Sequence, residues 1–211
     1  MVKVVTVTTF LEMESALQGR LDLAGRPGVE VTRAVVGDAP VLRSMCLEIG
    51  REHLWVSRIA WTDGDFERLL ADGKVHVWIA REKRTPVGFI ELSEQERKAV
   101  KMALLGIRPA YAGRGMGRYL LSFGIAQAWG MGAERVRVET RTYDGERALN
   151  NYLQRGFKIK KRRPEIIVVP ERYDGNVTTI IQRARERGVF PSPLRRLEAY
   201  VRAFCRASAV R

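Results

Sequence analysis

The sequence predicts an α+β domain in which mostly antiparallel strands form a central sheet and helices cover it. Three runs rich in apolar and β-branched residues, at 74–81, 87–94 and 99–107, follow one another with only short connections, which is typical of antiparallel strands. Apolar residues recur at helical spacing before and after these runs, as expected of helices that bury one face against a sheet. We therefore expect strands and helices to pack as layers of one unit.

Length and composition are those of a globular protein. The chain has 211 residues, of which 45% are hydrophobic and 29% charged, and that length allows one domain with a proper core plus extensions. The N-terminal residues lack the order of a secretory signal peptide, and no apolar run approaches the ~20 residues of a membrane span. Two cysteines, Cys46 and Cys205, and two histidines, His53 and His76, show no metal-ligand spacing. We expect a cytoplasmic protein with reduced thiols, no metal and no membrane partner.

The net charge of +13 is concentrated toward the C-terminus. Residues 141–211 hold 17 basic and 7 acidic side chains, whereas residues 1–100 hold 14 basic and 15 acidic ones. This excess favours an anionic partner, whether nucleotide phosphates, nucleic acid or an acidic protein. Nucleic acid is the weaker interpretation, because the chain has no basic motif interleaved with aromatic residues.

Residues 1–28 are predicted to form an extension of one strand and one helix. The β-branched run at 2–9 indicates the strand, and the segment 11–23 has helical spacing with a capping box that begins at Thr9. The sequence AGRPG that follows is typical of a turn, so we expect a domain boundary at residue 28.

A strand at 29–36 and a helix at 38–52 come next. Asp38 can cap this helix, and Cys46 lies among its apolar positions. We interpret Cys46 as a core residue rather than a nucleophile, because no histidine is spaced to serve as its partner.

Trp55, Arg58 and Trp61 lie in the short segment after this helix. Tryptophan and arginine are common anchors in binding sites, so the three residues are candidates for lining the cleft of an acceptor substrate. The alternative is that these three side chains pack against the sheet, which explains their residue types equally well.

The chain beyond residue 132 is predicted to add a strand at 135–140, a helix at 146–155 that Gly156 ends, and two short strands at 157–161 and 166–169. A basic helical extension then occupies residues 171–211.

Two helices are predicted in this extension, at 178–187 and 194–207. The second has an apolar stripe along one face, which suits docking on its own domain or on a second subunit. A homodimer is therefore a candidate assembly.

Gly113, Gly115 and Gly117 stand at alternate positions just before a helix predicted to end near Gly130 or Gly132. Glycines there let the backbone approach a ligand, and the unpaired N–H groups of the first helical turn attract a phosphate. No GxxxxGK[ST] string occurs, which excludes a Walker loop. The antiparallel strands that precede the loop are not the setting of a dinucleotide-binding βαβ unit.

Two segments together resemble the GNAT superfamily of N-acetyltransferases: GIRPAYAGRGMGRYLL, which contains the glycine loop, and ERALNNYLQRGF, which follows after one helix and one strand. In that family the loop holds the pyrophosphate of acetyl-coenzyme A. Ala148, Tyr152, Gly156 and Phe157 keep the spacing of the family's second pattern. The resemblance implies a GNAT domain over 29–170, a three-layer fold with two splayed strands and helices on both faces.

The resemblance also implies the reaction, in which acetyl-coenzyme A is the cosubstrate and a primary amine of a small molecule or peptide attacks its thioester directly in a ternary complex. Tyr152 is then the general acid for the leaving thiolate, since a phenol with a pKa of roughly 10 can protonate a thiolate. The implied cofactor-binding residues are Leu105, Gly106, Ile107, Gly113, Arg114, Gly115, Met116, Gly117, Arg118 and Asn151.

Two departures from the family pattern affect cofactor contacts. Ala112 stands where the family has Gln or Arg, which removes a side-chain contact but leaves the backbone N–H groups. Gly145 stands where the family has Asn, so that contact with the pantetheine arm is absent or comes from Asn150 or Asn151.

A third departure affects catalysis. Lys101 occupies a strand position where relatives carry an acid, and a protonated lysine cannot accept the proton of an amine. Glu139 and Glu91 remain as candidates for the general base. The same departure leaves open a second function, an acetyl-coenzyme A sensor that regulates a protein partner without turnover.

Overall fold

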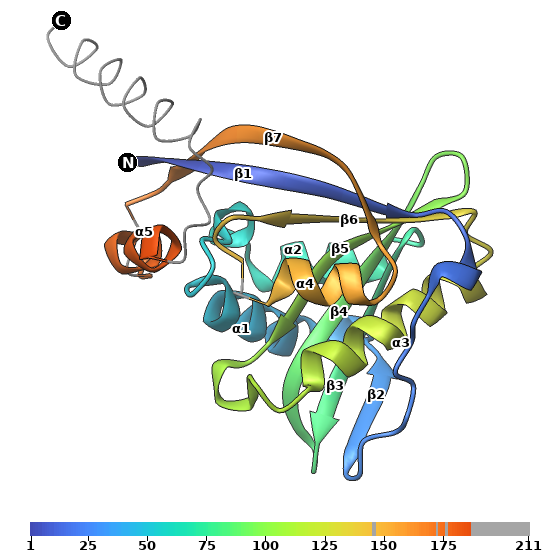
Figure 1. Ribbon diagram of the computed structural model, residues 1–211. Helices are drawn as coiled ribbons and strands as arrows, with labels where there is room; N and C mark the ends of the chain where they lie inside the picture. The colour runs from blue at the N-terminus through green and yellow to red at the C-terminus, as the bar shows by residue number, and fades with distance from the viewer. Residues whose placement is uncertain (145–146, 172, 176, 187–211) are drawn as a thin grey trace, which may run out of the picture.

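A seven-stranded sheet forms the centre of the molecule, and helices cover both of its faces (Figure 1). The computed structural model describes residues 1–144, 147–171, 173–175 and 177–186. The strands are β1 (Val2–Met13), β2 (Val29–Arg33), β3 (Val75–Glu82), β4 (Thr85–Gln95), β5 (Ala99–Ile107), β6 (Arg135–Arg141) and β7 (Lys158–Val169). The helices are α1 (Ala39–Gly50), α2 (Asp63–Ala71), α3 (Met116–Gly130), α4 (Ala148–Gln154) and α5 (Val177–Glu186).

The strand order is β2-β3-β4-β5-β6-β1-β7. Every neighbouring pair is antiparallel except β5 and β6, which are parallel. The predicted α+β class with a mixed, mostly antiparallel sheet is therefore confirmed. None of the described helices is long and apolar enough to cross a membrane.

The helix predicted at 11–23 is wrong. Leu11 and Met13 belong to β1, and only Ala16–Gln18 form a short 3-10 turn. The side chains of Leu11 and Met13 lie opposite buried valines of β6 in the core. Burial between two strands therefore overrides the helical spacing of the local sequence.

The two short strands predicted at 157–161 and 166–169 are one strand, β7, which runs through Pro164. β7 lies at the edge of the sheet, where a residue without an N–H group can stand without breaking a ladder between two strands.

The first helix of the predicted C-terminal extension is observed as α5. Its Ile180 packs with Val4 of β1 and with Leu54, so α5 docks on its own chain. The helix predicted at 194–207, and Cys205 with it, lie outside the described residues.

β1 is an interior strand of the sheet. It lies between β6 and β7 and pairs antiparallel with both. The first strand of the chain thus lies between the last two strands, β6 and β7, at one side of the sheet (Figure 1). The predicted domain boundaries at residues 28 and 170 stay predictions.

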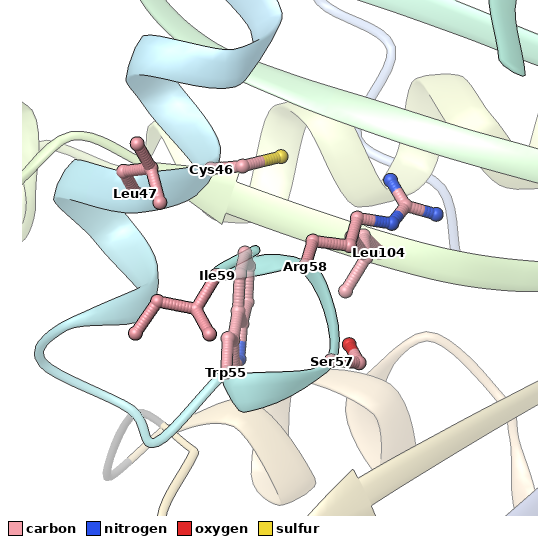
Figure 2. A pocket seen from close by; sticks show the side chains of 7 residues that line it. All are labelled: Cys46, Leu47, Trp55, Ser57, Arg58, Ile59 and Leu104. Atoms are coloured by element: carbon pink, nitrogen blue, oxygen red, sulfur yellow. The ribbon is translucent and has the colours of Figure 1, made fainter. Parts of the chain in front are cut away.

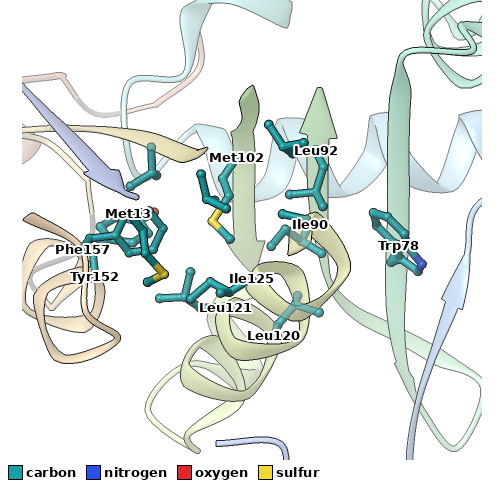
Figure 3. Packing of buried hydrophobic residues seen from close by; sticks show 14 of the residues in the cluster. Met13, Trp78, Ile90, Leu92, Met102, Leu120, Leu121, Ile125, Tyr152 and Phe157 are labelled. Atoms are coloured by element: carbon teal, nitrogen blue, oxygen red, sulfur yellow. The ribbon is translucent and has the colours of Figure 1, made fainter. Parts of the chain in front are cut away.

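Apolar residues form a separate core on each face of the sheet. On one face Leu121 and Ile125 of α3 lie toward Met102 of β5 in a shared core (Figure 3). On the other face Phe66 of α2 and residues of α1 cover Phe89 of β4. The two cores fix the helices that flank the site.

β5 and β6 pair only along their first halves. Their parallel ladder ends at Met102 and Val138, and the register of β5 on β4 shifts between Glu91 and Leu92, so that Ala103 bulges from the ladder. Beyond this point β5 stays paired with β4 and β6 with β1. The facing edges of the separated halves have no described strand partner, and such edges can pair with an extended ligand.

Gly156 gives a test of the packing between α4 and the N-terminal segment. Its φ is +101°, and a Cβ there would collide with the carbonyl oxygen of Gln18. We expect Gly156→Ala to lower the free energy of unfolding by more than ~2 kcal/mol, because a backbone collision is added to left-handed strain of roughly 1–2 kcal/mol. Urea unfolding measures the loss.

Gly132→Ala is the matched control. Gly132 has a φ of +80°, and a Cβ added there would meet no atom within 4 Å, so only the strain should be measured. Equal losses for the two variants would contradict close packing of Gly156 on Gln18.

Candidate functional site

The glycine loop forms a backbone nest at the start of α3. Gly113 and Gly115 have φ values of +80° and +78°, which residues with a side chain adopt only with strain. Gly115 directly precedes the first helical turn, and no side chain in the described structure caps it. The N–H groups of that turn are available to an anion at the positive end of the helix dipole.

The side chains of this loop differ in exposure. Arg114 and Arg118 are exposed, and the Arg114 guanidinium lies 5.3 Å from the centre of the Tyr111 ring. The Met116 side chain is buried in the core beside α3. Two cations therefore flank the nest, whereas Met116 can meet a ligand only through its backbone.

Leu105, Gly106 and Ile107 form the end of β5, in the half that is separated from β6. They pair with β4, and one 3-10 turn, Pro109–Tyr111, connects them to the glycine loop. Gly106 is needed for space, because a Cβ there would lie 3.0 Å from the side chains of Ile49 and Trp55. The predicted pantetheine-binding strand is thus continuous with the nest and packs against Trp55.

Tyr152 lies on α4, with its ring edge-on to Phe157 at a centroid distance of 5.9 Å. Its side chain is buried. Burial raises the pKa of Tyr152 above its ordinary value, and the charge of Asp144 adds to this effect. The phenol is therefore protonated at physiological pH and has a proton to donate, although the raised pKa makes it a weaker acid than an exposed tyrosine.

Asn151 links α4 to the glycine loop. Its side-chain amide donates a hydrogen bond to the carbonyl oxygen of Gly117 at 3.4 Å, which holds α4 against the first turn of α3. Asn150 is exposed, and Gly145 lies outside the described residues.

Both candidate bases are in ion pairs. Glu139 Oε1 accepts a hydrogen bond from Lys101 Nζ at 2.8 Å, and the two side chains are 28% and 33% exposed. Glu139 directly follows Val138, where β6 leaves β5. Glu91 accepts two hydrogen bonds from Arg58, at 2.6 and 2.7 Å, and its side chain is 3% exposed. Glu91 is enclosed by its pairing, whereas solvent still reaches Glu139.

A small pocket lies between the segment after α1 and β5 (Figure 2). Trp55 and Arg58 line it. Trp61 instead packs against the Arg58 guanidinium, whose Cζ lies 4.6 Å from the centre of the Trp61 ring. The Trp61 ring also lies edge-on to Phe66. The residues that line the pocket are Cys46, Leu47, Trp55, Ser57, Arg58, Ile59 and Leu104.

Cys46 lines this pocket but is not suited to nucleophilic catalysis. It is buried in the core on the α1 face. Burial raises the pKa of its thiol to about 12, although the neighbouring Arg58 favours the thiolate. The thiol is therefore protonated at neutral pH, in agreement with a core role.

Asp144 is a carboxylate that sequence reasoning did not place at the site. Its Oδ2 accepts hydrogen bonds from the Thr140 hydroxyl at 2.8 Å and the Arg141 N–H at 2.7 Å, and its Oδ1 accepts one from the Trp55 indole at 3.4 Å. Asp144 thereby connects the end of β6 to the tryptophan that packs on β5. An aspartate after a strand indicates a turn, but nothing local signals a contact with Trp55.

The buried pair of Arg58 and Glu91 predicts a large loss of stability when one partner is removed. We expect Arg58→Met to lower the free energy of unfolding by about 3–5 kcal/mol, because the Glu91 carboxylate is left buried without its cation. Lys98→Met, which breaks an exposed pair with Glu134, should leave stability unchanged. Urea unfolding tests both variants, and similar stabilities for the two would show that the buried pair has no special role.

Comparisons with known proteins find a matching family. The sequence model of the acetyltransferase (GNAT) family matches residues 46–157, which include the glycine loop and α4. No curated protein matches the chain.

Similar folds occur among solved structures. They include a protein of Novosphingobium aromaticivorans described as a GNAT-family acetyltransferase (TM-score 0.56, 14% identity) and GCN5-related N-acetyltransferases of Kribbella flavida (0.56, 14%) and Sphaerobacter thermophilus (0.55, 19%). The alignments cover 76%, 84% and 77% of this chain, and 63%, 62% and 50% of those chains. The chain thus spans less than two thirds of their length. Because the family match extends over more than half of the sequence and the sheet has the fold of these structures, the chain belongs to the GNAT family of acetyltransferases.

Proposed function

We propose that the chain transfers an acetyl group from acetyl-coenzyme A to a primary amine of a small molecule or peptide, by direct attack in a ternary complex. The observation that carries the proposal is the path of β5, which leaves β6 and leads through one 3-10 turn, Pro109–Tyr111, to the nest at α3. Asn151 holds α4, and with it Tyr152, against the same helical turn. Family membership supports acetyl-coenzyme A as the cosubstrate.

In this proposal the nest binds the pyrophosphate. The N–H groups from Gly115 to Arg118 donate to phosphate oxygens, and the guanidinium groups of Arg114 and Arg118 add charge-assisted contacts. The pantetheine arm lies along Leu105–Ile107 and pairs with their backbone as an added strand would. This path places the thioester near the point where β5 and β6 separate.

The chemistry requires one proton acceptor and one proton donor. The neutral amine attacks the thioester carbonyl carbon, the C–N bond forms and the C–S bond breaks. Glu139 accepts the proton that the amine loses, through a water, and Tyr152 donates its hydroxyl proton to the sulfur of the leaving coenzyme A. Positioning of the two reactants supplies the remaining acceleration.

The acceptor would enter beside the segment after α1. Trp55 and Arg58 line the pocket that adjoins Leu104, and Trp61 supports Arg58 from outside it. Because Glu91 already holds the Arg58 guanidinium, Arg58 would shape this wall of the acceptor site together with Trp55, rather than capture a carboxylate of the acceptor.

One observation favours a second function, an acetyl-coenzyme A sensor that regulates a protein partner. Glu139 is paired with Lys101, and Glu91 with Arg58, so neither carboxylate is a free base. A sensor would bind the cofactor through the same nest but would release no thiol with any amine.

Cofactor binding at the nest predicts the effect of a charge in the first turn of α3. We expect Gly117→Asp to weaken coenzyme A binding about tenfold or more, because the carboxylate repels the pyrophosphate although an acidic residue at a helix N-terminus is compatible with folding. A Cβ at Gly117 meets only Ile107, at 3.8 Å. Isothermal titration calorimetry measures the affinity.

Gly130→Asp is the control, because it places the same charge at the opposite end of α3, where a Cβ has open space. This variant should bind coenzyme A with the affinity of the wild type. Unchanged affinity in Gly117→Asp would show that the loop is not the pyrophosphate site.

Catalysis predicts that Tyr152→Phe lowers kcat by about 10²-fold or more, with little change in KM for acetyl-coenzyme A. Phenylalanine keeps the packing on Phe157 and removes only the proton donor. Thiol release with a panel of primary amines measures turnover. Tyr173→Phe, which removes a hydroxyl bonded to the Arg51 carbonyl, is the control and should leave kcat unchanged.

The same panel separates the two functions. Thiol release by the wild-type chain with at least one amine supports the transferase, and unchanged kcat in Tyr152→Phe would remove the tyrosine from the mechanism. Cofactor binding without release from any amine would instead favour the sensor.

A further inference from the structure

We infer that Arg26, in the segment that joins β1 to β2, is a ligand of the coenzyme A pyrophosphate, an inference that rests on the proposed function. Its Nη2 donates a hydrogen bond to the carbonyl oxygen of Gly115 at 3.4 Å. A Cβ on Gly115 would lie 3.0 to 3.3 Å from Nη2, Cζ and Nη1 of this guanidinium. A third cation, 89 residues before the loop in sequence, therefore lies directly beside the nest.

The guanidinium of Arg26 has donors that the protein does not use. A guanidinium carries five N–H donors, and here the bond to Gly115 is long. The Nε atom is buried and has no hydrogen-bond partner in the described part of the chain. The carboxylate of Asp22 forms a partly exposed ion pair with Nη2 at 3.6 Å, a distance too long for a hydrogen bond. Buried donors without partners are costly, so a phosphate that presents paired oxygens to this side chain would be bound favourably.

The segment that carries Arg26 is anchored to the helices of the site. The Arg20 N–H donates to the Arg155 carbonyl at 3.2 Å, and the Arg155 guanidinium donates to the Arg20 carbonyl at 3.0 Å. The Asp22 N–H donates to the Ser122 hydroxyl of α3 at 3.0 Å. These bonds hold Arg26 at the loop before a ligand arrives, which reduces the entropy lost on binding.

Coenzyme A carries two phosphate groups that an arginine could bind, the pyrophosphate and the 3′-phosphate of the adenosine. Arg26 contacts Gly115, the residue whose neighbouring N–H groups form the nest. The position of this contact favours the pyrophosphate. Arg26 would then add its positive charge to those of Arg114 and Arg118 and help to neutralise the negative charge of the pyrophosphate.

Calorimetry of the full chain with coenzyme A and with dephospho-coenzyme A tests the inference, because the second ligand lacks only the 3′-phosphate. We expect Arg26→Met to lower the affinity for both ligands by about tenfold or more. Arg20→Met removes the same charge from the same segment and should change either affinity by less than about twofold. Arg26→Lys keeps the charge without the paired donors, and should recover part of the affinity.

Two outcomes overturn the inference. In the first, Arg26→Met binds both ligands with the affinity of the wild type. In the second, Arg26→Met binds only coenzyme A more weakly, which would place Arg26 on the 3′-phosphate. Both leave the proposed function intact when the wild-type chain binds coenzyme A. If the wild-type chain binds neither ligand, the proposed function fails together with the inference.

Discussion

The separation of β5 from β6 is the feature on which the rest of the structure depends. Parallel pairing ends at Met102 and Val138, next to the bulge at Ala103, and bulges bend the strand that carries them. From there each strand is held on one side only, β5 by β4 and β6 by β1. The nest, α4 and the segment after α1 are arranged around these two open edges, which is why one extended molecule could contact all of them.

The N-terminal residues hold the separated half of β6 from its other edge. Residues 139–141 of β6 have no partner on β5, and residues 8–10 of β1 pair with them on the opposite edge. After β1 the chain is anchored on α4 at Arg155 and on α3 at Ser122, and then reaches β2. The first 28 residues therefore support the site from two directions: they hold the free half of β6, and they bring Arg26 to the loop.

Those parts of the fold that local sequence determines could be predicted. The strands at 74–81, 87–94 and 99–107, the glycine loop and the helix that bears Tyr152 each have their own pattern, and the structure has these elements where they were expected. The segment 11–23 has a helical pattern but is strand and turn, because two neighbouring strands pair with its first residues. Only distant pairing decides that outcome.

The contacts within the candidate site were less predictable, since they join residues far apart in the chain. Arg58 with Glu91, Asp144 with Trp55, and Arg26 with Gly115 are separated by 33, 89 and 89 positions. Residue type suggested that Arg58 and Trp55 bind something. Only the fold shows that the partner of Arg58 is a buried carboxylate, and that Trp55 lies beside Gly106 of β5 and donates to Asp144 after β6.

The central claim is that coenzyme A binds with its pyrophosphate at the nest and its pantetheine arm along the free edge of β5. Hydrogen–deuterium exchange of the wild-type chain, with and without coenzyme A, tests this most directly. The account predicts slower exchange of the amides of residues 105–107 and 115–118 when the ligand is bound. Protection confined to other elements, with these amides unchanged, would contradict it.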